Sequence, residues 1–146
     1  MNILLDTHVA LWAITDSARL SLRARELIQT PANTLWISVA SLWEITIKHS
    51  LGKLSLPLPP DQYIPDRLLA MGDLALEIEQ EHVLRLTALP YHHKDPFDRL
   101  LVAQAQVEGM RLVSADAQIA KYDVDLLWAG AGEAGAGKGR RGVHGL

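Results

Sequence analysis

Short apolar runs that alternate with segments of helical spacing constrain the fold of this chain more than any other feature. The apolar runs lie at residues 3–5, 35–37, 111–113 and 124–127. The first three stop at a polar residue, which is Asp6, Ser38 or Ser114, and they are short enough to be buried strands. Helical spacing is found at residues 20–29, 39–51, 66–71, 79–86 and 96–108, the last followed by Gly109 as a C-terminal cap. Strands that alternate with helices predict an α/β fold, in which helices cover both faces of a mostly parallel sheet.

The size and composition of the chain fit one folded domain. It has 146 residues, of which 49% are hydrophobic and 21% are charged. Because there are no cysteines, any bound metal must be held by oxygen or imidazole ligands. The formal net charge of -3 does not by itself indicate a nucleic-acid-binding protein. The first twelve residues fit neither a signal peptide nor a membrane span, so we expect a cytoplasmic protein without a membrane partner.

Two segments differ in composition from the rest of the chain. Residues 56–65 hold four of the seven prolines and predict a stiff, extended connection between helices. Residues 129–146 are rich in glycine and are expected to form a disordered tail, which leaves residues 1–128 as the folded domain. Residues 132–139 nearly match a phosphate-binding loop, but Gly139 stands where a magnesium-binding hydroxyl is needed, so we exclude nucleotide binding there.

Four acidic residues stand where a strand ends or a helix starts: Asp6, Glu44, Asp98 and Asp116. Each has a simple local explanation, since Asp6 and Asp116 can cap the helical turns that follow and Ser41 to Glu44 fits a capping box. The carboxyl ends of parallel strands, however, meet at one edge of a sheet, where ligands bind. Four carboxylates at that edge would repel one another unless a cation lies among them, and oxygen ligands favour Mg²⁺ or Mn²⁺.

Four spaced motifs in these regions resemble those of one protein family. They are LLDTHVALW at 4–12, ISVASLWEITIKHSLGKL at 37–54, HHKDPFDRLLVAQA at 92–105 and LVSADAQIAKYDVDLLW at 112–128. In this order they resemble the motifs of PIN-domain ribonucleases, specifically the VapC toxins of toxin-antitoxin pairs. The resemblance implies a three-layer α/β/α sandwich, a homodimer, an RNA substrate and a cognate VapB-type antitoxin as partner. It also places the catalytic, metal-binding acids of the family on Asp6, Glu44, Asp98 and Asp116.

The chemistry of the four acids agrees with hydrolysis of a phosphodiester. A carboxylate-held Mg²⁺ neutralises charge on the phosphate and activates water, so no nucleophilic side chain is needed. We expect Thr7, Ser114 and Asp95 to support these acids without binding the ion, with Asp95 as the N-cap of the helix that begins at Pro96. For each hydroxyl, a purely local capping bond is the alternative.

Basic and aromatic residues near the acids have two interpretations each. Lys48 and Arg99 are candidate RNA-binding residues, although such cations are often no more than solvated helix faces. The adjacent pair His92 and His93 lacks the spacing of a zinc site. The four tryptophans are expected to belong to the core rather than to stack on bases: Trp12, Trp36, Trp43 and Trp128.

The resulting hypothesis is a Mg²⁺-dependent endoribonuclease toxin that is inhibited by its antitoxin. Two alternatives stay open, a housekeeping RNA-processing nuclease and a catalytically inactive PIN module that binds RNA or an antitoxin. A phosphatase of the haloacid dehalogenase type is disfavoured, because Asp6 is not followed by a second Asp two residues later.

Overall fold

The computed structural model describes residues 1–130 of the chain. Its elements, in order, are β1 (Asn2–Leu5), α1 (Thr7–Ile14), α2 (Leu22–Gln29), β2 (Thr34–Ser38), α3 (Val39–Ser50), α4 (Pro60–Met71), β3 (Leu74–Leu76), α5 (Gln80–Arg85), η1 (Leu86–Ala88), α6 (Pro96–Glu108), β4 (Arg111–Ser114), η2 (Ile119–Lys121) and β5 (Leu126–Trp128). The prediction of a disordered tail falls on residues 129–146, of which 131–146 lie outside the described residues. No helix within residues 1–130 is both long enough and apolar enough to cross a bilayer.

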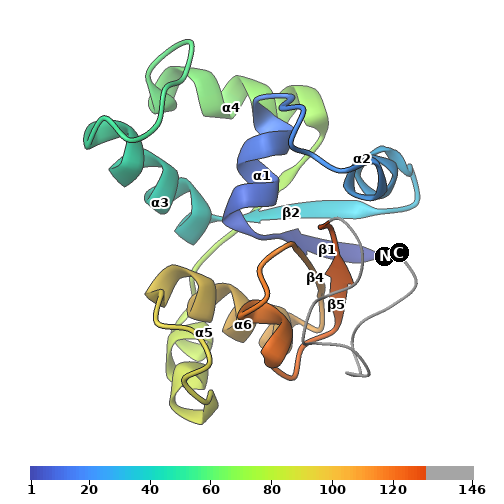
Figure 1. Cartoon of the computed structure of the whole chain (residues 1–146), viewed down its shortest axis with the longest axis vertical. Coiled ribbons are helices and arrows are strands. Elements are labelled where there is room, and N and C mark those ends of the chain that lie inside the picture. The colour runs from blue at the N-terminus through green and yellow to red at the C-terminus, as the bar shows by residue number, and fades with distance from the viewer. Residues whose placement is uncertain (131–146) are drawn as a thin grey trace.

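The five strands form one parallel sheet with the order β3-β2-β1-β4-β5. Figure 1 shows α1, α2 and α4 over one face of this sheet and α5 and α6 on the opposite face. The chain builds outward from β1 in one direction through β2 and β3, and then returns to add β4 and β5 on the other side. In such sheets, ligands bind at the carboxyl ends of the strands where the order reverses, which here means the end of β1 and its neighbours.

Alternating side chains on each strand supply two cores, one on each face of the sheet. On β1, Ile3 and Leu5 pack with α1 and α2, whereas Leu4 packs with α6. On β4, Leu112 packs in the core with α6, and Val113 packs in the core with α1 and α2. The helix α3 follows β2 at the end of the sheet and contacts both α1 and α6. Burial on both faces explains why these strands appear in the sequence as continuous apolar runs.

The prolines predicted that the segment 56–65 is extended. This prediction is wrong for its second half, because α4 begins at Pro60. Proline is well tolerated at a helix start, where its missing N–H would have no partner in any case. Pro65 lies inside the helix at an exposed position. Contacts with α1 hold the helix in place: Tyr63 Oη and Arg67 Nε both donate hydrogen bonds to the carbonyl of Ile14. Tertiary contacts therefore override the local preference of the prolines.

Candidate active site

Asp6 lies at the carboxyl end of β1 and is almost fully buried. Its Oδ1 accepts a hydrogen bond from the backbone N–H of Val9 at 2.8 Å, so Asp6 caps α1 as the sequence predicted. Its Oδ2 accepts from Ser114 Oγ at 2.5 Å, across the sheet on β4. Burial raises the pKa of Asp6 to about 6, against the opposing effect of the hydrogen bonds from Ser114 and Val9. The carboxylate is held rigidly in an environment that disfavours its charge.

Ser114 connects two of the four acids. Besides donating to Asp6, its Oγ accepts from the backbone N–H of Asp116 at 3.0 Å. Asp116 uses Oδ1 to cap the turn that follows, accepting from the N–H groups of Gln118 at 2.7 Å and Ile119 at 3.3 Å. Its other oxygen, Oδ2, faces the imidazole of His93. Asp116 can therefore cap the turn with one carboxylate oxygen and belong to the acidic group with the other.

Asp98 lies in the first turn of α6 and is 8% exposed. Asp95 precedes it as the N-cap and accepts from the N–H of Phe97 at 2.8 Å, as predicted. Burial is the main cause that raises the pKa of Asp98 to about 8. Neighbouring negative charges add to this shift, in the order Asp95, Asp6, Glu44 and Asp116. The structure therefore brings all four predicted acids close enough to interact.

Glu44 lies in the second turn of α3 and is 5% exposed. Its Oε2 forms an ion pair with Lys48 Nζ at 3.0 Å, one turn later on the same helix. Its Oε1 is buried and has no hydrogen-bond partner within residues 1–130. A buried carboxylate oxygen without a partner is costly, and a bound cation would remove that cost.

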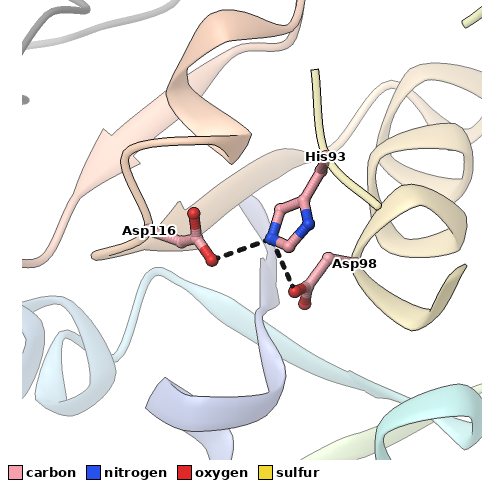
Figure 2. A group of neighbouring side chains, drawn as sticks. All are labelled: His93, Asp98 and Asp116. Atoms are coloured by element: carbon pink, nitrogen blue, oxygen red, sulfur yellow. Dashed lines mark hydrogen bonds and ion pairs between the residues drawn. The ribbon is translucent and has the colours of Figure 1, made fainter. Parts of the chain in front are cut away.

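His93 also belongs to the site, although nothing in the sequence distinguishes it from His92. Figure 2 shows its imidazole pointing between Asp98 and Asp116, with Nε2 3.0 Å from Oδ2 of each. The other ring nitrogen, Nδ1, accepts from the N–H of Asp95 at 3.1 Å, so the proton lies on Nε2. The backbone N–H of His93 donates to Tyr122 Oη at 3.0 Å, which fixes the loop.

A divalent cation fits this group of side chains. One ligand atom from each of His93, Asp98 and Asp116 lies within 4.8 Å of the others, and Asp6 and Glu44 add nearby carboxylates. Mutual repulsion and unpartnered oxygen are what a cation would relieve. The oxygen-rich set suits Mg²⁺ or Mn²⁺.

Four sequence-based expectations about neighbouring residues need correction, those for Arg99, Ser41, Thr7 and Trp43. Arg99 is not available to RNA, because it is 7% exposed and its Nη2 donates to the carbonyl of Leu89 at 3.0 Å. The Tyr91 ring covers its guanidinium at 3.9 Å. Ser41 does not cap α3; its hydroxyl lies 3.0 Å from Thr7 Oγ1, so Thr7 contacts α3 rather than one of the acids.

The cap of α3 is instead Ser38, whose Oγ accepts from the N–H of Ala40 at 3.0 Å. Trp43 does not belong to the core either, since it is 58% exposed and packs edge-on against Phe97 with ring centroids 5.1 Å apart. Trp128 is buried as expected.

The comparisons with known proteins agree with this geometry. Residues 3–125 match the family model of the PIN domain, so the chain belongs to the PIN-domain family. It is 30% identical to Ribonuclease VapC22 of Mycobacterium tuberculosis over 122 residues, which cover 83% of this chain and 92% of the relative. It is 40% identical to Ribonuclease VapC16 of the same organism over 58 residues, 40% of this chain and 41% of that one.

Among solved structures, VapBC2 from Rickettsia felis bound to a DNA fragment from their promoter is similar, with a TM-score of 0.63 and 16% identity. The match covers 88% of this chain and 98% of that chain. The predicted α/β/α fold and the resemblance to VapC-type PIN domains are both confirmed.

Proposed function

We propose that this chain is a Mg²⁺- or Mn²⁺-dependent endoribonuclease of the VapC type, which hydrolyses RNA phosphodiester bonds as a toxin. The observation that carries the proposal is the convergence of four buried or half-buried carboxylates, one of which has a pKa near 8, at the switch point of the sheet. The names of the relatives VapC22 and VapC16 support ribonuclease activity. Neighbours of the VapBC type support a VapB-type antitoxin as partner.

A divalent ion, when bound, would neutralise charge on the phosphate and make water a better nucleophile. The side chains that would hold it are Asp6, Glu44, Asp98 and Asp116, with His93 beside them. Ser114 and the start of α1 keep Asp6 in one orientation, and Lys48 does the same for Glu44. Because the pKa of Asp98 is raised to about 8, this carboxyl group would hold a proton at pH 7 that a bound cation would displace. His93 Nε2 lies between Asp98 and Asp116, 3.0 Å from an oxygen of each, and so orients both carboxylates.

The direct test is cleavage of a fluorescently labelled single-stranded RNA by the purified chain. We expect cleavage with Mg²⁺ or Mn²⁺, none in EDTA, and a loss of several orders of magnitude in Asp98→Asn. Asp66→Asn is the matched control, because Asp66 is exposed on α4 and outside the acidic group. Cleavage that persists in EDTA, or equal loss in both variants, would contradict the proposal.

The toxin role has its own test, because a housekeeping nuclease would have the same chemistry. Expression in a bacterial host should arrest growth, co-expression of the cognate antitoxin should relieve the arrest, and Asp6→Asn should abolish it. Sedimentation of the purified chain should give a homodimer, and fractionation should place it in the cytoplasm. An inactive PIN module would instead bind the antitoxin without any arrest.

A further inference from the structure

A cleft adjoins the acidic group on the side of α1. It has a volume of about 270 Å³ and is lined by Asp6, His8, Trp12, Arg19, Ala115 and Asp116. Two of the proposed metal ligands, Asp6 and Asp116, thus line the cleft, together with Ala115 and with residues from α1 and the loop after it. Ligand pockets usually begin at about 300 Å³, so a cleft of this size suits one small unit rather than a folded segment.

Arg19 gives this cleft a positive charge next to the carboxylates. The residue is exposed, and its guanidinium makes no side-chain hydrogen bond or ion pair within the described part of the chain. Lys48 differs in this respect, since Glu44 already neutralises it. Arg99 is also excluded, because it is buried. A free guanidinium has the fork of donors that binds a phosphate group.

Trp12 supplies an aromatic surface to the same cleft. The indole is half-buried: it packs against the core under α1 and also lines the cleft. His8 lies one turn earlier on α1, with its ring centroid 6.0 Å from that of Trp12. An indole that is fixed by packing and open on another side can stack on a base at little entropic cost.

We propose that this cleft is a nucleotide subsite of the substrate RNA, in which Arg19 binds a backbone phosphate and Trp12 stacks on the adjoining base. The subsite rests on the RNA-cleaving function proposed above and extends it. A nucleotide held there lies against Asp6 and Asp116, which places the next phosphodiester of the strand at the acidic group. The guanidinium of Arg19 and the indole of Trp12 would together favour single-stranded RNA without strong base specificity.

The test is the affinity of a short labelled single-stranded RNA, measured by fluorescence anisotropy in EDTA at several salt concentrations. We expect Arg19→Ala to weaken binding and to reduce the slope of log K against log salt by about 0.7, the value for one phosphate contact on a single strand. Arg23→Ala is the matched control, because Arg23 is exposed on α2 and outside the cleft. Trp12→Leu should weaken binding roughly tenfold, whereas Trp12→Phe should keep most of it.

Cleavage kinetics and melting temperature complete the experiment. Arg19→Ala should raise KM for RNA while its Mn²⁺ affinity and melting temperature stay those of the wild type. If RNA is cleaved but Arg19→Ala leaves KM and the salt slope unchanged, the subsite is wrong and the nuclease function stands. If the wild type does not cleave RNA but binding still depends on Arg19 and Trp12, the nuclease proposal fails and the binding site stands. Equal losses in Arg19→Ala and Arg23→Ala would overturn the subsite as well.

Discussion

Replacement of Asp98 by asparagine should stabilise the metal-free protein while it abolishes catalysis. Asp98 is 8% exposed and has a pKa of about 8 in the folded state, against 3.8 for the ordinary carboxyl group. Because the folded state prefers the protonated form, the carboxyl group stabilises the protein below pH 3.8, and this stabilisation is lost as the pH rises toward 8. Asparagine has nearly the same shape and cannot ionise, so the variant does not suffer this loss.

The size of the effect follows from the shift in pKa. At pH 7 the difference in the pKa of Asp98 between the folded and the unfolded protein corresponds to a loss of up to about 4 kcal/mol in the free energy of unfolding. The advantage of Asp98→Asn over the wild type should therefore grow by about 1.4 kcal/mol per pH unit between pH 4 and 8 and then level off. Urea unfolding in EDTA at pH 5, 6, 7 and 8, followed by tryptophan fluorescence, measures this difference directly.

Asp95→Asn is the matched control for this experiment. Asparagine caps a helix about as well as aspartate, so α6 keeps its N-cap. The variant should keep most of its activity and gain only a little stability, because the charge of Asp95 is a secondary cause of the shift at Asp98. The reasoning is refuted if Asp98→Asn is less stable than the wild type in EDTA, or if its advantage does not change with pH.

Two further predictions concern residues outside the metal-binding group. Both carboxylate oxygens of Asp73 are buried without a hydrogen-bond partner in the described part of the chain, and burial raises the pKa of Asp73 to about 6. Asp73→Asn should therefore raise the free energy of unfolding by about 1 kcal/mol at pH 7, after allowance for partial solvent screening. This gain in stability should vanish near pH 4. Urea melts at both pH values measure it, and a gain that is the same at both would contradict the prediction. Arg99→Ala should lower the free energy of unfolding by about 2 to 3 kcal/mol, because two backbone carbonyls lose their donor, yet leave kcat of the folded protein unchanged; a selective rise in KM for RNA would restore Arg99 as a substrate-binding residue.

The local features of the site were predictable because they depend on residues close in sequence. Pro96 and the acids beside it predicted Asp95 as the N-cap of α6, and Gly109 ends this helix in the left-handed conformation expected of a C-terminal cap. The alternation of short apolar runs with helices predicted the parallel sheet, and parallel strands bring Asp6 and Asp116 to one edge.

Features that depend on contacts between distant segments were not predictable. His93 reaches the acids because its loop is fixed by the hydroxyl of Tyr122, 29 positions later in the chain. Arg99 looked like a free cation in the sequence, but its guanidinium donates to the carbonyls of Leu86 in η1 and Leu89 in the loop before α6. The strand β3 (LAL) is as short and apolar as the other strands, but it was not predicted from the sequence, and only Leu76 of its three residues is buried.

The most direct test of the central claim is calorimetric titration of the metal-free protein with Mn²⁺ at pH 7, in buffers of different ionisation enthalpy. Since Asp98 is mostly protonated at this pH, a cation bound by the four acids must displace its proton. We predict saturable binding with release of about one proton per ion from the wild type, and strongly weakened binding without that proton release from Asp98→Asn. Binding of equal affinity in both proteins, or binding to the wild type with no proton released, would contradict a metal centre built on Asp6, Glu44, Asp98 and Asp116.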